Sequence, residues 1–273
     1  MRLQVHYTTS YSYSDPPRRI IQLLRVTPLS YAGQTVLDWR IDVDCDARLH
    51  ENRDGYGNVI HMLYIDRPGR ELQVTVSGRV LTEDAAGVIA GLAGDLPPPV
   101  FLQSTPLTEP GPGIAQYRAI VGGEGPVLDR LHRLNAAIHE GMGFDTGQTH
   151  AGTTACEAAT AGHGVCQDFA HIFIAAARTS GIPARYVSGH LLRRDGMVWQ
   201  EAAHAWVEAW VEDLGWTAFD PTHGISTDDA HIRVAAGLDY RDAAPFAGAR
   251  NGGGTEALAV EVQVRQVQAQ VQN

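Results

Sequence analysis

The stretch Gly162–Phe169, with the sequence GHGVCQDF, places a cysteine where a glycine-containing loop meets the start of a helix. Apolar residues then recur on one face of this helix, which is predicted to end near Gly181, two residues before a proline. The amide N–H groups at a helix start are unpaired and lie at the positive end of the helix dipole, so they stabilise an anion. Cys166 is therefore a candidate nucleophile, although cysteines are more often small apolar core residues.

A histidine and an aspartate follow Cys166 in separate predicted strands. His204 lies within the strand-like segment 203–211, and Asp220 follows the segment 216–219, directly before a proline. A turn at 213–215 would pair these segments and set His204 opposite Asp220, with Cβ atoms roughly 4.5 to 5.5 Å apart. A thiolate nucleophile needs a base, and the base needs an acceptor that orients it. Each residue taken alone is more often structural, but their order predicts a catalytic triad of Cys166, His204 and Asp220.

The segments around the triad predict an α+β domain. Apolar residues at helical spacing predict a helix from Val127 to about Gly141. A capping-box sequence at Thr154 predicts a short helix that ends near Gly162. The nucleophile helix comes next, and the strand-like segments 184–192, 203–211 and 216–219 follow it. Helices followed by antiparallel strands indicate an α+β catalytic domain, which we assign to residues 125–250.

Short strands dominate residues 1–83. Alternating or β-branched residues mark the segments 3–13, 36–43, 59–65 and 72–80, and the sequences DGYGN at 54–58 and RPG at 67–69 predict turns between them. This pattern predicts a β-sandwich-like N-terminal domain. Residues 84–124 are rich in Gly and Pro and predict a connector with little regular structure. Residues 251–273 predict a flexible glycine spacer at 251–254 and a final strand within 257–271 that returns to one of the domains.

Composition argues against several classes of protein. The 273 residues include 21 basic and 31 acidic ones, a net charge of −10, which disfavours nucleic acids and anionic membranes as partners. The three cysteines are not spaced in pairs and indicate neither a disulfide framework nor a zinc site. No window approaches the roughly 20 apolar residues that span a bilayer, and the first residues lack the apolar core of a signal peptide. We therefore expect a cytoplasmic protein with reduced thiols.

Four blocks of the sequence resemble those of a known family. GVCQDFAH at 164–171, GIPARYVSG at 181–189, HAWVE at 204–208 and FDPT at 219–222 are similar to the core blocks of bacterial transglutaminase-like enzymes, often described as cysteine proteases. The Cys, His and Asp of those blocks fall on Cys166, His204 and Asp220. RVTP at 25–28 and DGYGN at 54–58 also resemble the β-rich region that precedes this core in the family.

This resemblance implies a papain-like core, in which the nucleophile helix packs on an antiparallel sheet. One departure is His223, where relatives commonly carry Asn after the sequence DPT. The role of that position is therefore open.

The predicted chemistry is acyl transfer through a thioester, on a peptide or protein substrate and with no cofactor. Cys166 would attack a carboxamide or peptide carbonyl, His204 would protonate the leaving amine, and Asp220 would fix the imidazole tautomer. The Cys166 N–H is a reasonable oxyanion donor, and Gln167 is a weak candidate for the second donor. Hydrolysis is favoured. Transamidation by an amine and a non-catalytic binding module are the alternatives, and the sequence does not indicate an oligomeric state.

Other residues that could carry chemistry rank lower. Asp168 is expected to favour the helix start through the dipole, and a role beside the nucleophile is the alternative for it. Four scattered histidines form no HExxH motif, and no metal site is predicted from them: His150, His163, His171 and His190. Four tryptophans are more often core residues than the lining of a cleft: Trp199, Trp206, Trp210 and Trp216. Cys45 and Cys156 are expected to be structural.

Overall fold

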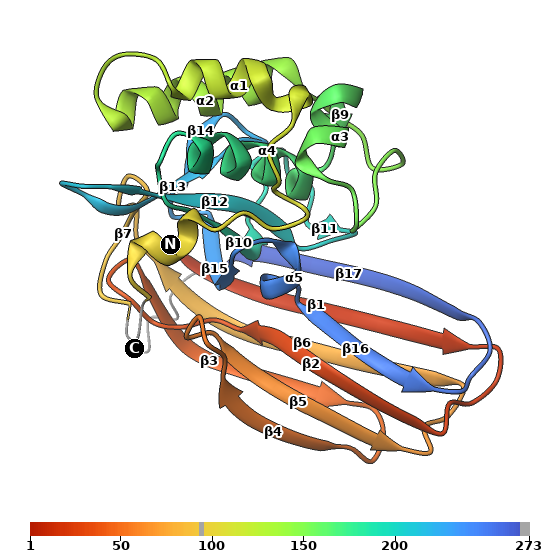
Figure 1. The fold of residues 1–273 in the computed structure, drawn as a ribbon. Helices are drawn as coiled ribbons and strands as arrows, with labels where there is room; N and C mark the ends of the chain where they lie inside the picture. Colours follow the sequence, from red (N-terminus) through yellow and green to blue (C-terminus); the bar gives the residue numbers. More distant parts are fainter. Residues whose placement is uncertain (93–95, 268–273) are drawn as a thin grey trace, which may run out of the picture.

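The computed structural model describes residues 1–92 and 96–267, which form two stacked parts (Figure 1). The lower part in the figure is a sandwich of two antiparallel sheets. The upper part is a third sheet with helices packed on its outer face. The α+β class and the strand-rich N-terminal region predicted from the sequence are both confirmed.

Each sheet of the sandwich combines strands from the two ends of the chain. The first sheet has the order β11-β17-β1-β6-β3. Its strands are β1 (Arg2–Tyr13), β3 (Gln34–Val43), β6 (Glu71–Thr82), β11 (Trp199–Gln200) and β17 (Glu256–Gln266). The second sheet has the order β16-β2-β5-β4. Its strands are β2 (Arg19–Thr27), β4 (Arg48–Arg53), β5 (Val59–Asp66) and β16 (Phe246–Asn251).

Alternating side chains build the core of the sandwich. In β6, Leu72, Val74 and Val76 point inward and are buried, while their neighbours along the strand are more exposed. They share one apolar core with Ile20 of β2 and Leu63 of β5. Strand β4 was not predicted, because all six of its residues are exposed and it therefore lacks the alternation that marks a strand.

The third sheet carries the candidate site. Its order is β14-β13-β12-β10-β15, and a short strand, β7 (Val88–Ile89), also pairs with β13. Its other strands are β10 (Ala184–Leu191), β12 (His204–Val211), β13 (Gly215–Asp220), β14 (Ile225–Ser226) and β15 (His231–Gly237). The pairs within this sheet are antiparallel.

Helices cover the outer face of this sheet. They are α1 (Ala115–Val121), α2 (Val127–Gly141), α3 (Ala155–Ala161) and α4 (Cys166–Thr179), with a short α5 (Tyr240–Ala243) after β15. The bounds of α2, α3 and α4 agree with the predicted helices. Helix α4 lies between the other helices and the sheet, and Phe169 and Phe173 bury their side chains in the core shared with Val207 of β12. This burial fixes the position of its first residue, Cys166.

Residues 84–92 and 96–124 are more ordered than the predicted connector, and residues 93–95 lie outside the described part. The described residues of this segment contain the 3-10 helices η1 (Pro98–Leu102) and η2 (Pro112–Ile114) as well as α1, which buries Tyr117 and Val121 in the core around α4. Arg178 of α4 also donates hydrogen bonds to the Phe101 carbonyl oxygen at 3.0 Å and to the Thr108 hydroxyl at 2.9 Å. Glycine and proline content predicts turns, but it does not show that a segment packs through its few apolar residues.

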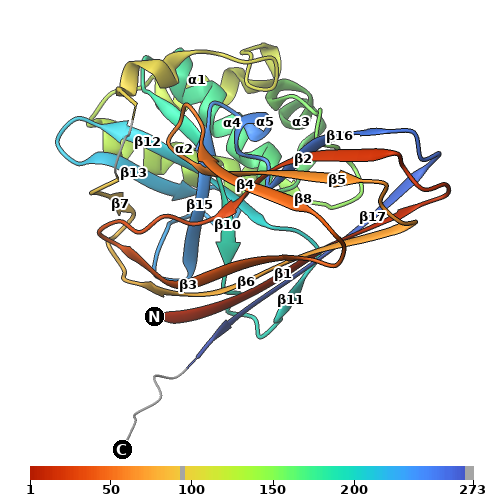
Figure 2. The same ribbon diagram turned by 90° about the horizontal axis from the view of Figure 1, so that it is seen from below.

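The end of the chain departs from the predicted spacer. Asn251–Gly254 forms a turn between β16 and β17, and its three glycines have φ between 57° and 98°, a region that favours glycine. The Arg250 guanidinium donates to the carbonyl oxygen of Gly254 at 2.8 Å. The strand predicted within 257–271 is observed as β17, and residues 268–273 lie outside the described part. Figure 2 shows β17 beside β1, and β16, which we assigned to the catalytic domain, beside β2.

Two amide side chains join the sandwich to the third sheet. β15 is the last strand of that sheet, and its outer edge would otherwise present unpaired backbone groups. Gln34 donates to the Arg233 carbonyl oxygen at 2.9 Å and accepts from the Arg233 N–H at 2.8 Å. Asn58 bonds the N–H and carbonyl of Ala236 in the same way, at 2.8 and 2.7 Å. These two amides therefore take the place of a neighbouring strand.

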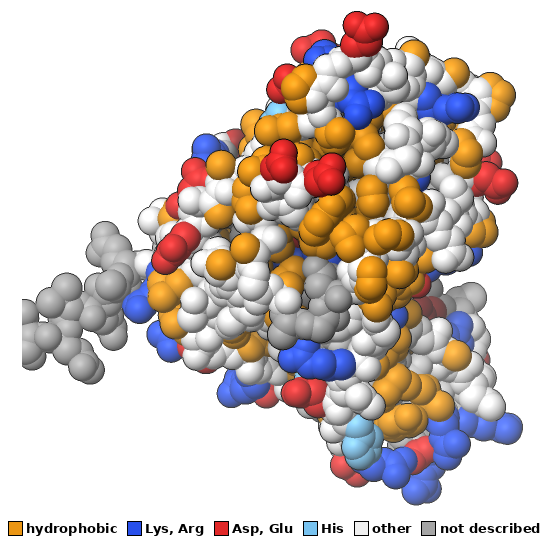
Figure 3. All heavy atoms as spheres, turned by 60° about the vertical axis from the view of Figure 1, so that its left-hand side comes forward, with side chains coloured by type: hydrophobic (Ala, Val, Ile, Leu, Met, Phe, Trp, Pro, Cys, Tyr) orange, Lys and Arg blue, Asp and Glu red, His pale blue; other side chains and the backbone are white. Residues whose placement is uncertain are grey.

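The surface mixes charged and apolar side chains. On the face shown in Figure 3, hydrophobic side chains gather near the middle, and Arg side chains lie among Asp and Glu around them. Among the described residues, no helix has the length and apolar character needed to cross a membrane.

Candidate active site

Cys166 is the first residue of α4, and a buried carboxylate fixes the loop before it. Asp168 accepts hydrogen bonds from the Val165 N–H at 2.8 Å and from the Thr149 hydroxyl at 2.7 Å. A Cβ atom at Gly164 would lie 2.6 Å from this carboxylate, so the loop can take this path only with glycine there. Asp168 thus holds the start of the helix, as expected from its position.

The structure brings Cys166, His204 and Asp220 together. His204 begins β12, Asp220 ends β13, and the His204 Nε2 atom lies 2.7 Å from Asp220 Oδ2. Cys166 lies close enough to the same imidazole to act on its pKa.

The observed register lies within the range that the turn at 213–215 predicts, but His204 and Asp220 are not directly opposite each other. Val207 is paired with Phe219, so Asp220 faces Trp206, and His204 lies diagonally across from it. The imidazole and carboxylate meet because side chains two residues apart lie on the same face of a strand. Diagonal neighbours are close enough for long side chains to interact.

Five hydrogen bonds converge on Asp220, whose side chain is completely buried. Its Oδ2 atom is bonded to His204 at 2.7 Å, to His223 Nδ1 at 2.8 Å and to His231 Nε2 at 3.2 Å. Its Oδ1 atom accepts from the backbone N–H groups of Thr222 and His223 at 3.0 and 3.3 Å. Burial acts to raise the pKa of Asp220, but the charge of His204 and the imidazole hydrogen bonds hold it well below the usual value. Asp220 is therefore an anion at neutral pH.

The same contacts stabilise the charged form of His204. Burial lowers the pKa of this imidazole, but Asp220 and Cys166 outweigh that effect and raise it to about 10. The raised pKa of His204 favours transfer of the thiol proton to the neutral imidazole, which yields a thiolate and an imidazolium. The arrangement can therefore supply both a nucleophile and an acid for a leaving group.

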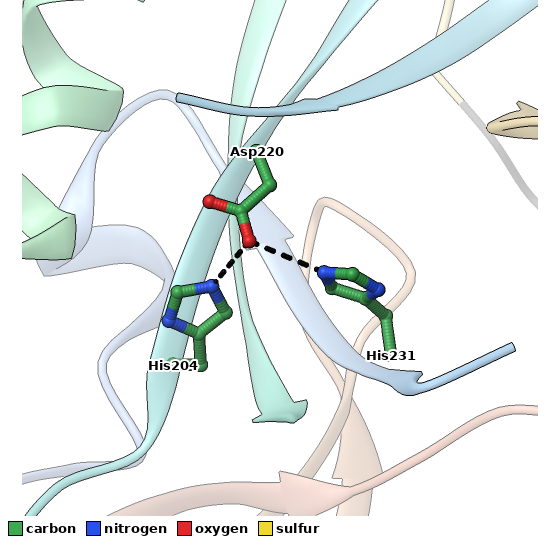
Figure 4. A group of neighbouring side chains, drawn as sticks. All are labelled: His204, Asp220 and His231. Carbon is green, nitrogen blue, oxygen red and sulfur yellow. Dashed lines mark hydrogen bonds and ion pairs between the residues drawn. The ribbon is translucent and has the colours of Figure 1, made fainter. Parts of the chain in front are cut away.

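His231, the first residue of β15, was not identified from the sequence. It is buried and contacts Asp220 (Figure 4). Its other nitrogen, Nδ1, lies 3.0 Å from Asp228 Oδ1. The sequence offered only a weak signal, a histidine three residues after an aspartate at the start of a mainly apolar segment. His223, noted as a departure from the family pattern, is 46 % exposed and also contacts Asp220.

His204, Asp220 and His231 form a group that could hold a metal ion, with ligand atoms within 4.8 Å of one another. However, His204 Nε2 lies 2.7 Å and His231 Nε2 lies 3.2 Å from Asp220 Oδ2, and both are hydrogen-bond distances. Asp220 is ionised and can only accept, so each of these nitrogens carries the proton. A metal ligand needs a free lone pair instead, and the arrangement therefore fits a hydrogen-bond network better than a metal site.

Other residues singled out from the sequence have structural surroundings. The Gln167 amide donates to the Ala151 carbonyl oxygen at 3.3 Å and so points into a neighbouring loop, which does not support it as an oxyanion donor. His171 is buried behind Cys166 and accepts a hydrogen bond from the Tyr240 N–H at 3.2 Å, and burial lowers its pKa to about 3. His190 is buried against rings of the sandwich, and its pKa is lowered to about 4.

The other two of these histidines, together with Trp206, Trp210 and Trp216, lie in the part that contains the third sheet, whereas Trp199 lies in β11 of the sandwich. His150 accepts from the Gly152 N–H at 3.0 Å, and His163 lies in β9 (His163–Gly164), which pairs with β8 (Gly143–Phe144). Trp206 is buried, with its ring centroid 6.0 Å from that of His204 and 5.4 Å from that of His231, so it supports both imidazoles. Trp210 and Trp216 pack against each other, whereas Trp199 is exposed.

The other two cysteines lie apart from the site residues described above. Cys156 accepts a hydrogen bond from the Gly113 N–H at 3.2 Å and so joins α3 to η2. Cys45 packs against the core of the sandwich. Both contacts agree with the structural roles expected for them.

Comparisons with known proteins agree with this arrangement. Residues 115–221 match the model of the transglutaminase-like superfamily, and residues 3–81 match that of the bacterial transglutaminase-like N-terminal region. The chain belongs to the transglutaminase-like superfamily. An uncharacterized protein of Mycobacterium leprae is 30 % identical over 280 residues, which cover 96 % of this chain and 98 % of that protein.

Two further relatives of this superfamily member bear on fold and chemistry. A crystal structure described as a putative cysteine protease from Cytophaga hutchinsonii has a TM-score of 0.80 at 21 % identity, covering 100 % of this chain and 92 % of that one. It shows the same fold over both parts. A protein-glutamine gamma-glutamyltransferase of Pseudomonas aeruginosa is 37 % identical over 82 residues, which cover 28 % of this chain and 12 % of that protein.

Proposed function

We propose that this protein is a cysteine-dependent enzyme that hydrolyses peptide or carboxamide bonds through a thioester. The observation that carries the proposal is the convergence of three groups: a thiol at a helix start, an imidazole whose pKa that thiol influences, and a buried carboxylate hydrogen-bonded to the imidazole. The resemblance to cysteine proteases of the same fold supports it. A binding module without activity would not need a charged histidine buried beside a thiol.

The proposed reaction begins with attack by the Cys166 thiolate on the carbonyl carbon. A C–S bond forms, and the developing oxyanion accepts a hydrogen bond from the Cys166 N–H, which has no partner within the helix because it opens the first turn. The C–N bond then breaks as the His204 imidazolium gives its proton to the leaving amine. Asp220 keeps the His204 ring oriented throughout.

The second half of the reaction releases the acyl group. The neutral His204 imidazole takes a proton from water, and the resulting hydroxide attacks the thioester carbonyl. The C–S bond breaks, a carboxylic acid is released, and the thiolate and imidazolium are restored. None of these steps needs a cofactor.

Alkylation by iodoacetamide across a range of pH tests the first part of this proposal, with Cys45 and Cys156 as internal controls. We expect Cys166 to react well below the pH of about 8.5 near which a free thiol ionises. The His204→Ala variant should lose this advantage. Equal rates for the three cysteines, measured by mass spectrometry of the labelled peptides, would contradict the proposal.

Transamidation is the second candidate function, and the similarity to a protein-glutamine gamma-glutamyltransferase favours it. In that case an amine, rather than water, attacks the thioester. Incubation of a glutamine-containing peptide with the enzyme and an isotopically labelled primary amine separates the two functions. Incorporation of the amine would indicate transfer, whereas release of the free acid alone would indicate hydrolysis.

A further inference from the structure

His231 is held between the candidate site and a second carboxylate. Its side chain is 3 % exposed, and it joins Asp220, through Nε2, to Asp228, through Nδ1. Asp228 is itself fixed, because its carboxylate accepts from the Ala230 N–H at 2.9 Å and pairs with Arg194. The ring of Trp206 packs edge-on against the imidazole. His231 therefore has little freedom to rotate.

Both protonation states of His231 present the same proton to Asp220. When the ring is neutral, Nε2 carries the proton and Nδ1 accepts from the Asp228 backbone N–H, which lies 3.2 Å away. When the ring is charged, Nδ1 donates to the Asp228 carboxylate instead. Burial works against the charged form, but Asp220 and Asp228 raise the pKa of His231 above its usual value. In either state the Nε2 proton points at Asp220.

We propose that His231, oriented by Asp228, is a positioning residue that holds the Asp220 carboxylate ionised and aimed at His204. This inference rests on the proposed function of Cys166, because it concerns how the base of that reaction is oriented. The 2.7 Å bond to His204 requires Oδ2 to stay in one place. His231 is a further donor at Oδ2, beside His204 and His223. Because it comes from a separate strand, β15, it opposes rotation of the carboxylate away from His204.

Charged and titratable groups reach His231 from several elements. They are His204 of β12, Asp220 of β13, His223 of the following turn, Asp228 before β15 and, through Asp228, Arg194 of the segment after β10. Two of these groups act in opposite directions on His231, since Asp220 stabilises its charged form and His204 destabilises it. The inference does not depend on the charge, because the donated proton is present in both forms.

Two substitutions separate a positioning role from a purely structural one. His231→Gln keeps an N–H donor at about the place of Nε2, whereas His231→Leu fills the space and donates nothing. A hydrogen bond to a buried charged group contributes about 1.5 to 3 kcal/mol. We therefore expect His231→Leu to slow alkylation of Cys166 at neutral pH by about tenfold to hundredfold. In His231→Leu we also expect the alkylation rate of Cys166 to begin its rise at a higher pH, because Asp220 then stabilises the His204 imidazolium less well.

The His231→Gln variant should be alkylated at Cys166 with a rate within a few-fold of that of the unchanged protein, and the pH profile of this rate should stay the same. Asp228→Ala should have a smaller effect than His231→Leu, since the backbone N–H of residue 228 still fixes the tautomer. His190→Leu is a matched control, because His190 is a buried histidine on the adjacent strand β10. We expect this control to change the melting temperature but not the rate per folded molecule.

Three results would decide against the inference or its basis. An unchanged rate and profile in His231→Leu, or an equal loss in His231→Gln, would overturn the positioning role. If Cys166 of the unchanged protein reacts no faster than Cys45 and Cys156, the proposed function itself fails first. Should His231→Leu not fold, His231→Asn takes its place, because its shorter amide does not reach Asp220 and the same loss is expected.

Discussion

Two carboxylates are buried on neighbouring strands of the third sheet, and they have different partners. Glu208 of β12 lies between two guanidinium groups, 2.6 Å from Arg185 Nε and 2.7 Å from Arg233 Nε. Asp220 of β13 lies among three imidazoles. Neither side chain is exposed, and opposing charge lowers the pKa of both below the usual value against the effect of burial. Both are therefore anions held by hydrogen bonds.

The difference lies in what the partners can do. A guanidinium keeps its proton at every accessible pH, so the Glu208 network has a single state and acts as a fixed support. An imidazole can gain and lose a proton near neutral pH, so the Asp220 network can take part in proton transfer. Cation–π packing of Arg185 over Trp216, at 4.0 Å, fits the supporting role. We infer that the buried Glu208 carboxylate serves stability, whereas the buried Asp220 carboxylate serves chemistry.

Replacing Asp220 should have the largest effect on activity. Asp220→Asn keeps the shape but offers no negative charge, and its amide can leave His204 in the wrong tautomer. By comparison with known triads, we expect turnover to fall by about 10³- to 10⁴-fold. The rate constant for a carboxamide substrate checks this, and the Glu208→Gln variant is the matched control. A fall of less than tenfold would remove Asp220 from the proposed mechanism.

The charge on His204 should make stability depend on pH in a defined range. Its pKa is raised to about 10 in the folded protein and is 6.5 in the unfolded chain. The stability that it contributes is therefore complete below about pH 6.5 and is lost as the pH rises through about 10. Melting temperatures measured from pH 6 to 10 should fall, and they should fall less in His204→Gln. Parallel curves for the two proteins would contradict a raised pKa.

Glu208→Gln should act on stability alone. Removing one member of a buried ion pair costs about 3 to 5 kcal/mol, because the attraction between the buried charges is lost. We expect chemical denaturation to show a loss of this size. The alkylation rate of Cys166, measured on the folded fraction, should remain within a few-fold. A large change in that rate without a change in stability would break the distinction between the two networks.

The smallest effect is expected at the junction of the two parts. Asn58→Ala removes two hydrogen bonds from the backbone of Ala236 and leaves that N–H and carbonyl unpaired. Each lost hydrogen bond contributes about 0.5 to 1.5 kcal/mol, so the two together should cost about 1 to 3 kcal/mol. Urea denaturation should show a loss in this range, with Asn52→Ala, on the exposed strand β4, as a neutral control. An unchanged midpoint would show that Asn58 does not support β15.

Local signals in the sequence predicted helices α2, α3 and α4 and the order of the candidate residues. The Thr154 capping box and the positions of Cys166 and Gly181 are properties of neighbouring residues, and the structure agrees with the helices predicted from them. The exact strand register was not predictable, because the turn at 213–215 fixes the pairing only to within about two residues. His231 was missed because its link to Asp220 depends on how two separate strands are placed.

The sandwich was predicted as an N-terminal domain, and the sequence could not show that β16 and β17, near the other end of the chain, belong to its two sheets. Alternation in β6 and the hairpin at 54–58 were visible, but pairing between β1 and β17 joins residues about 250 positions apart. No local pattern carries that information. The role of Asn58 is of the same kind, because its sequence context predicts only a turn, while its side chain completes the edge of a distant strand.

The return of β16 and β17 to the sandwich has a consequence for how the chain folds during synthesis. Strand β1 lies between β6 and β17, and β2 lies between β5 and β16. As the ribosome releases the chain, the first 83 residues emerge without two of their neighbours, and both β1 and β2 keep an open edge until the whole catalytic part has been translated. During synthesis these 83 residues therefore remain an incomplete and aggregation-prone sandwich until β16 and β17 pair with β2 and β1.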